Sequence, residues 1–187
     1  MAPPSPSQSQ PSTRTLRVAG WGLLGALFMV PVVAAQISPE VHWTALDFGV
    51  FWALLGMVGL GCDLAVRRLA RWSARLAWAL TLATAALLVL VNGAVGLIGP
   101  EGVDANGLFG IVLAVVAVGI AVSRADAQRM ASVMVAAAIT QLAVTSVILA
   151  ADMVPTAEQT GRDALFSGPG FAVLWLIAAY LFRRAAR

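Results

Sequence analysis

Few residues of this sequence belong to the types that carry most catalytic chemistry. One cysteine, Cys62, and one histidine, His42, rule out an intrachain disulfide and a multi-histidine metal site. The two lie near opposite ends of one apolar segment, so they cannot form a catalytic Cys/His pair within one chain. The chain also lacks an HExxH pair and a phosphate-binding glycine loop that ends in lysine. We therefore predict a protein that is not an enzyme and holds no cofactor or metal. A membrane enzyme acting on lipid would need a partner's residues or an outer site around His42 and Asp47.

Polar side chains at the ends and centres of apolar segments are the remaining candidates for a binding or transport role. Asp47 opens one such segment, where its carboxylate either faces a site or stabilises the helix start with Thr44 as N-cap. Gln141 lies at the middle of another, where a hydrogen bond between helices is the ordinary role and a substrate path is the alternative. Asn92 lies near the end of a third segment, where a buried amide needs partners.

An acidic turn follows Asn92 in the sequence. Glu101, Asp104 and Asn106 place three oxygen-bearing side chains within six residues. A hard cation such as calcium takes about 6–8 oxygen ligands, so a solvated turn is favoured over a cation site. Before the turn, glycines recur every third residue at 93, 96 and 99, and on a helix they would form a stripe that permits close packing.

The amino-acid composition shows whether these residues belong to a soluble protein or to a membrane protein. Hydrophobic residues make up 60% of the 187 and charged residues 11%, with a mean hydropathy of +0.87. Soluble domains have roughly 45–50% apolar and about 25% charged residues. Too few charges remain to cover a globular surface, which excludes a soluble enzyme and a nucleic-acid-binding domain.

Uncharged intervals divide the chain into membrane-spanning segments. Five intervals hold 19 to 25 residues, and a sixth, residues 48–62, holds 15 and must take a flanking aspartate into its end turns. A spanning helix needs about 20 apolar residues. We predict an all-α bundle of six transmembrane helices, at about 18–37, 46–66, 76–98, 107–123, 130–151 and 164–182. Residues 1–16, which begin with a Pro/Ser/Gln-rich tract, are predicted to be a disordered tail.

The arginines predict the orientation. When alternate loops are assigned to one side, 11 of the 12 basic residues, all arginine, fall together, and seven of the nine acids fall opposite. Short cytoplasmic loops collect basic residues, so both termini are predicted to be cytoplasmic. This arginine-lined inner face should contact anionic lipid headgroups rather than nucleic acid.

The first apolar segment has an alternative interpretation, and the second contains a predicted ion pair. Arg14 and Arg17, the apolar run after them, and the small residues before Gln36 also fit a cleavable signal peptide, whose removal would leave five helices. Asp63 precedes Arg67 by four residues, the favourable acid-first spacing for an ion pair along one helix face.

Two stretches resemble a family of small bacterial multi-pass membrane proteins with no assigned function. They are residues 42–48, His-Trp-Thr-Ala-Leu-Asp-Phe, and residues 92–99, Asn-Gly-Ala-Val-Gly-Leu-Ile-Gly, followed by Glu101 and by Ala105-Asn106. The family has a compact acidic turn, Ser-Glu-Asp-Asn-Pro-Ala-Asn. In residues 100–106 of this chain the acidic residues stand at different positions. The resemblance implies the helical fold and a bacterial inner membrane. It implies no activity, substrate or cofactor.

The sequence thus predicts a non-catalytic inner-membrane protein, an accessory or assembly partner that associates with another protein or with its own copies. The alternative is a small solute or ion transporter or channel with a polar outer vestibule formed by Asp47, Asn92, Glu101, Asp104 and Asn106. Gln141 would lie within its membrane path.

Overall fold

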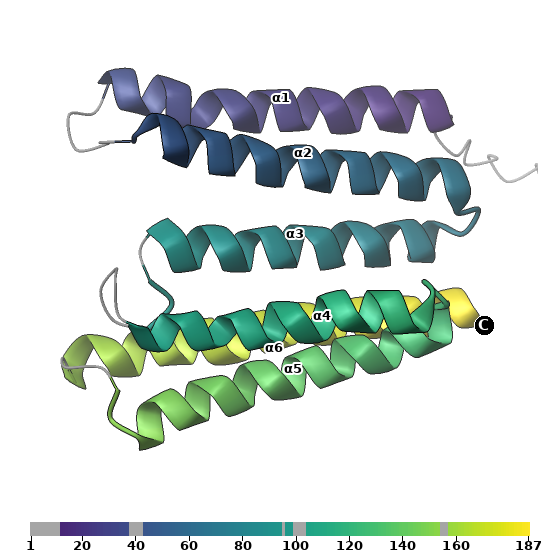
Figure 1. Ribbon diagram of the computed structural model, residues 1–187. Coiled ribbons are helices and arrows are strands. Elements are labelled where there is room, and N and C mark those ends of the chain that lie inside the picture. The colour runs from purple at the N-terminus through teal and green to yellow at the C-terminus, as the bar shows by residue number, and fades with distance from the viewer. Residues whose placement is uncertain (1–11, 38–42, 95, 99–103, 154–156) are drawn as a thin grey trace, which may run out of the picture. The chain divides into compact units, whose positions relative to one another are not determined.

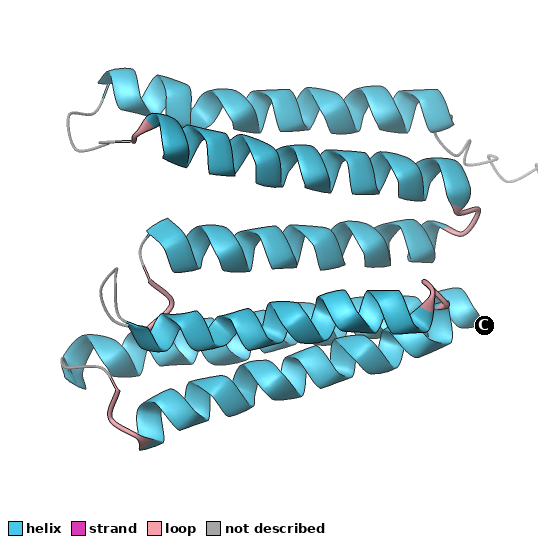
Figure 2. Cartoon of the chain, in the orientation of Figure 1, coloured by secondary structure: helices cyan, strands magenta, loops and turns pink. Residues whose placement is uncertain are grey.

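The computed structural model describes residues 12–37, 43–94, 96–98, 104–153 and 157–187, with the backbone alone for residues 94 and 157–165. These residues form an all-α structure without strands (Figure 2). Helices dominate because nearly every segment is apolar, and a chain in lipid must satisfy its backbone hydrogen bonds within each segment.

Six α-helices and one 3-10 helix make up the described chain (Figure 1). Their bounds are α1 Thr13–Ile37, α2 Ala45–Arg68, α3 Trp72–Ala94, η1 Asp104–Phe109, α4 Gly110–Ser123, α5 Ala127–Ala150 and α6 Ala157–Ala186. Each α-helix, α4 together with η1, contains a window long and apolar enough to cross a membrane. The expected count of six spanning helices is confirmed for the described residues.

The third helix is shifted by four residues relative to the sequence prediction, since α3 begins at Trp72 rather than at residue 76. It was expected over 76–98, but α3 ends at Ala94 and the backbone bends at Leu97 and Ile98. Gly96 has a φ of 77°, in the left-handed region that glycine adopts without a steric penalty. The prediction of a glycine stripe along one continuous helix is therefore wrong, because Gly96 turns the chain out of the helix.

Other helix ends lie outside the predicted bounds. α1 begins at Thr13, so residues 13–16, which were expected in the tail, are helical, and residues 1–11 lie outside the described part. α6 begins at Ala157 and includes Arg162 and Asp163, which were expected in a loop. A helix can continue beyond the hydrocarbon because water solvates its charged side chains while its backbone bonds remain intact. The fourth predicted helix begins as η1, and α2 and α5 differ from prediction by three residues or fewer.

The chain divides into two units, residues 1–68 and 69–187. In the first unit, α1 and α2 run antiparallel (Figure 1). A Cβ on Gly59 of α2 would lie 2.7 Å from Leu24 Cδ1 and 3.1 Å from the Trp21 ring of α1. The missing side chain therefore allows the two helices to approach closely.

In the second unit, α3 and α5 run in one direction and α4 and α6 in the other (Figure 1). α6 packs against both α3 and α5, and α4 packs on α5. The start of α3, the end of α4, the start of α5 and the end of α6 therefore lie at one end of the unit. That end carries seven of its eight arginines: Arg71, Arg75, Arg124, Arg129, Arg183, Arg184 and Arg187.

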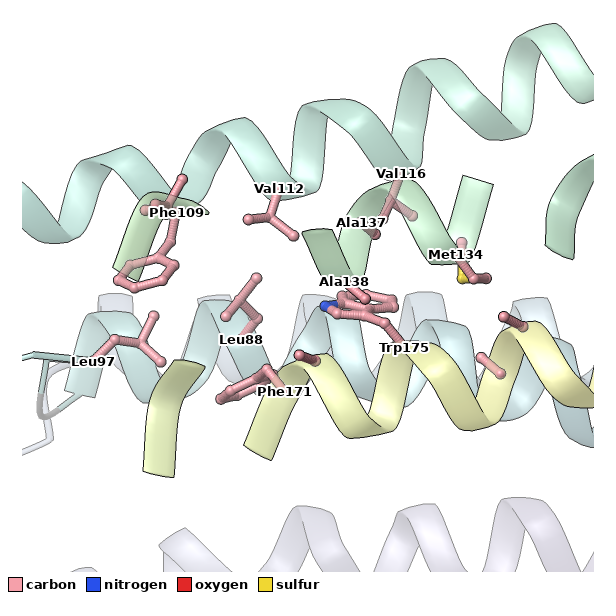
Figure 3. Packing of buried hydrophobic residues seen from close by; sticks show 14 of the residues in the cluster. Leu88, Leu97, Phe109, Val112, Val116, Met134, Ala137, Ala138, Phe171 and Trp175 are labelled. Atoms are coloured by element: carbon pink, nitrogen blue, oxygen red, sulfur yellow. The ribbon is translucent and has the colours of Figure 1, made fainter. Parts of the chain in front are cut away.

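The core of the second unit lies where α3, α5 and α6 meet, with α4 and η1 closing one side (Figure 3). Trp175 of α6 is fully buried, in the same cluster as Ala138 of α5 and Leu88 of α3 (Figure 3). The cluster also contains alanines of α5 and α6, such as Ala137 and Ala178, and small residues of this kind let helices pack closely.

Candidate functional site

Asp47 lies in the first turn of α2, where its carboxylate bonds to Thr44. The Thr44 backbone N–H donates to Asp47 Oδ2 at 2.7 Å, and the Thr44 hydroxyl donates to the same oxygen at 2.8 Å. The Asp47 N–H donates in return to Thr44 Oγ1 at 3.3 Å. This reciprocal pattern is a capping arrangement that satisfies the free N–H groups of a helix start. The geometry therefore favours the helix-start interpretation of Asp47.

Aromatic rings surround this end of the first unit. Trp43 meets Phe48 and Phe51 edge to face, with ring centres 5.2 Å and 5.5 Å apart. Phe28 of α1 stacks on Trp52 of α2 with ring centres 4.3 Å apart. Such pairs stabilise packing beyond their area of contact. Together with the cap, they fix how α2 begins beside α1. His42 lies outside the described residues.

At the opposite end of the same unit, Asp63 binds two arginines. Arg17 of α1 and Arg67, one turn along α2, both form ion pairs with its carboxylate, and the Arg67 Nη2 to Asp63 Oδ2 distance is 2.8 Å. The Asp63 side chain is only 12% exposed. The sequence predicted the pair with Arg67 but missed Arg17. The arginine pattern that placed both helix ends on one side of the membrane could have indicated it.

A groove borders this ion-pair cluster, between α1 and α2. It is lined in part by Arg17, Trp21, Gly59, Cys62 and Asp63. The Asp63 carboxylate already forms ion pairs with the Arg17 and Arg67 guanidiniums. The polar groups at the groove therefore serve to join α1 and α2. The glycine-rich run before Asp63 serves this close approach, since Gly59 packs against Trp21 and Leu24.

In the second unit, Asn106 is buried and bonds to the bend after α3. Its Oδ1 accepts from the Ile98 N–H at 3.0 Å, and its Nδ2 donates to the Ile98 carbonyl at 3.3 Å. Asn106 is 5% exposed, and Ile98 is fully buried. Asn106, which was predicted to help form a polar outer vestibule, thus bonds here to the backbone of its own chain. A bend in buried backbone leaves an N–H and a carbonyl unpaired, and one side-chain amide satisfies both.

The structure also describes Asp104 and Asn92, two other residues of the predicted outer vestibule. Asp104 is exposed and begins η1. Asn92 is half-buried in the last turn of α3, and its Oδ1 is buried without a hydrogen-bond partner in the described structure. Glu101 lies outside the described residues. Asn92 and Asp104 therefore lie near the end of the second unit where α3 ends and η1 begins. The described residues there do not form a set of ligands for an ion.

Gln141 joins α5 to α6 in the core of the second unit. Its side-chain Nε2 donates to the Ser167 backbone carbonyl at 3.1 Å, and the Gln141 backbone carbonyl accepts from Thr145 Oγ1 at 3.0 Å. A Cβ on Gly168 would lie 2.9 Å from Thr145 Cγ2, so α5 and α6 are close here. The run Ser167-Gly168-Pro169-Gly170 is a sequence signal for this close approach that was missed.

Several polar atoms in the same core lack hydrogen bonds. Gln141 Oε1, Ser167 Oγ, Thr84 Oγ1 and Trp175 Nε1 are buried without a partner in the described structure. They belong to α3, α5 and α6, the three helices that enclose the core. Buried polar groups of this kind ordinarily bond to protein or water. Of these four residues, only Gln141 was predicted from the sequence as a candidate functional residue.

This architecture defines the class: the chain is a multi-pass α-helical membrane protein. No family model matches the chain, and no curated protein or solved structure matches it. The family resemblance drawn from residues 42–48 and 92–99 accordingly stays a prediction.

Proposed function

We propose that the chain is a non-catalytic membrane protein that acts as an accessory or assembly partner of another membrane protein. One observation carries the proposal: Asp47, Asn106 and Gln141 all bond to atoms of their own chain. Asp47 caps a helix, Asn106 holds a bend and Gln141 joins two helices. Side chains used in this way support the protein's own structure, which favours a structural role over turnover or transport.

A partner would meet the apolar faces that the second unit turns outward. Ile111, Val118 and Val122 of α4 are 49%, 61% and 70% exposed. In lipid there is no hydrophobic driving force between helices, so association depends on close packing and a few polar contacts. A true partner should therefore contact one helix face and leave the others to lipid.

Photo-crosslinking in the native membrane tests this proposal. A photoreactive residue is placed at Val118 or Val122 of α4 and, for comparison, at Ile139 or Val147 of α5, which are similarly exposed. We expect one adduct of defined mass from one helix face only. Native mass spectrometry of the gently purified chain should show the same second subunit in a fixed ratio.

Two results would contradict the accessory role. One is a chain that forms no protein adduct at any position and purifies without a second subunit. The other is adduct formation with many different proteins from every position, which would indicate collision in the membrane rather than assembly.

Transport of a small solute or ion is the second candidate, and the unpartnered polar atoms in the core favour it. Gln141 Oε1, Ser167 Oγ, Thr84 Oγ1 and Trp175 Nε1 provide donors and acceptors within the membrane-spanning helices. Polar groups in such positions are costly and frequently line substrate or ion paths.

Flux of K⁺ into liposomes that contain the purified chain tests transport. If the core polar groups form the path, Gln141→Leu and Ser167→Ala should each lower the flux. Thr140→Val is the matched control, since the Thr140 hydroxyl bonds within its own helix to the Ala136 carbonyl. Equal flux from empty liposomes, or flux unchanged in both core variants, would remove support for this path.

We further propose that the protein lies in a bacterial inner membrane with both ends in the cytoplasm. In each unit the arginines gather at one end. Arg14, Arg17, Arg67 and Arg68 lie at one end of the α1–α2 pair, and seven arginines lie at one end of the second unit. The excess of basic residues in cytoplasmic loops supports this orientation.

A further inference from the structure

Four arginines lie at the end of the second unit where α3 begins and α6 ends. Arg71 precedes α3 and Arg75 lies in its first turn, while Arg183 and Arg184 lie in the last turn of α6. Because α3 packs directly on α6, two pairs of cations distant in sequence lie at the same end of this helix pair.

Hydrogen bonds to backbone carbonyls hold the two arginines of α3 in place. Arg71 Nη1 donates to the Ala185 carbonyl of α6 at 2.8 Å, and Arg75 Nε donates to the Leu69 carbonyl at 2.8 Å. Each bond uses a single guanidinium nitrogen. The planar guanidinium carries further N–H donors, which match the oxygens of a phosphate.

The electrostatics of this surface call for an anion. Within the described residues, both ion pairs involve Asp63 of the first unit, so these four arginines have no carboxylate partner there. The negative end of α6 favours Arg183 and Arg184, which explains that pair without a ligand. Arg71 and Arg75, however, lie at the positive end of α3, where the helix dipole disfavours a cation.

Aromatic side chains mark the depth of the surface. Trp72 and Tyr180 are 46% and 58% exposed, and the Arg184 guanidinium lies over the Tyr180 ring, 6.0 Å from its centre. Deeper in the unit, Trp78 and Phe182 join α3 to α6 with ring centres 5.6 Å apart. Exposed Trp and Tyr rings are enriched at the level of lipid headgroups.

We propose that Arg71, Arg75, Arg183 and Arg184 bind the phosphodiester headgroup of an anionic membrane phospholipid. The guanidiniums from the two helices hold the phosphate oxygens, and Trp72 and Tyr180 lie against the glycerol and upper acyl chains. A lipid is the ligand because charge, hydrogen-bond donors and exposed aromatic rings all occur at this end of the α3–α6 pair. A lipid bound there would join the start of α3 to the end of α6.

Native mass spectrometry of the full chain in detergent tests the proposal, with phosphatidylglycerol, cardiolipin and phosphatidylcholine as probes. The test variant is Arg183→Gln with Arg184→Gln, whose side chains are exposed and make no backbone bond in the described structure. Arg68→Gln with Arg129→Gln is the matched control, because it also removes two exposed charges near helix ends. We expect the test variant to bind the anionic lipids about thirtyfold more weakly and the control to bind as the natural chain does.

The other outcomes decide against the site. Equal loss in both double variants would show attraction by net charge alone, and no loss in either would place the lipid elsewhere. Equal binding of phosphatidylcholine would show that the arginines do not select the headgroup. Inorganic phosphate should leave the bound lipid in place even in excess, and displacement at low concentration would identify a free-phosphate site instead. Arg71→Lys, which keeps the charge but loses the planar fork, should bind with intermediate strength.

Discussion

The Gln141 side chain of α5 donates a hydrogen bond to the Ser167 carbonyl of α6 at 3.1 Å, in the core of the second unit. The bond joins a side chain and a backbone atom 26 residues apart and leaves Gln141 Oε1 without a partner in the described structure. One amide thus stabilises a helix pair while adding an unsatisfied acceptor to the same core.

Gln141→Leu should change the free energy of unfolding by no more than about 1 kcal/mol, because bonds of this kind contribute about that much in membranes. Leucine also removes the unpaired oxygen at similar volume. Gln141→Ala should cost about 2 kcal/mol or more, since it leaves a cavity. Reversible unfolding in detergent measures both. A leucine variant as unstable as the alanine variant would show that the amide holds more than one hydrogen bond, such as a bound polar molecule.

Gly119→Ala should separate α4 from α5. A Cβ on Gly119 would lie 2.2 Å from Val133 Cγ1, and valine has little rotamer freedom on a helix. Overpacking of this kind costs about 1–3 kcal/mol. Gly170→Ala is the control, since nothing lies within 4 Å of its added Cβ. Thermal unfolding should show a lower midpoint for Gly119→Ala alone. Equal midpoints would mean that α4 can shift away from α5 at little cost.

Asn106→Ala should destabilise the bend that follows α3. The substitution leaves the buried N–H and carbonyl of Ile98 unpaired, at a cost of about 2 kcal/mol or more. Hydrogen exchange at the Ile98 amide should become faster. Asp104→Ala, at an exposed position of the same 3-10 helix, should change stability by less than about 0.5 kcal/mol. An Ile98 amide that stays protected in Asn106→Ala would argue against the two bonds.

Asp63→Asn should loosen α1 from α2, because it removes the ion pairs with Arg17 and Arg67. Spin labels on cysteines at positions 14 and 68, in a chain carrying Cys62→Ser, report the separation of the two helix ends. We expect a broader distance distribution in the Asp63→Asn chain. Asp126→Asn, whose carboxylate caps α5 in the other unit, should leave the distribution unchanged. An unchanged distribution in both variants would show that packing at Gly59 alone holds the pair.

Single-cysteine labelling should reveal the orientation in the membrane. In a chain with Cys62→Ser, an impermeant maleimide applied to spheroplasts should label Gly107→Cys in η1 and leave Ala70→Cys, between α2 and α3, unlabelled. Both positions are exposed. Permeabilised cells should label both. The reverse pattern would contradict the orientation inferred from the arginines.

The sequence by itself determined the class of protein and the number of spanning helices. Charges are costly in hydrocarbon, so uncharged intervals of sufficient length locate the helices without knowledge of their neighbours. The Thr44–Asp47 cap was also visible in sequence, because its partners lie within one helical turn. The ion pair between Asp63 and Arg67 was visible for the same reason.

Tertiary structure decided the contacts between distant residues. Arg17 meets Asp63, Asn106 bonds to Ile98, and Arg71 bonds to Ala185, at sequence separations of 46, 8 and 114. Composition and periodicity do not specify which helix faces meet. That choice depends on small differences in close packing, such as the missing side chain at Gly119 or Gly168, and on the backbone turn at Gly96. The interval of 25 uncharged residues before Glu101 therefore predicted a third helix of the observed length, 23 residues, but placed it four residues too far along the chain.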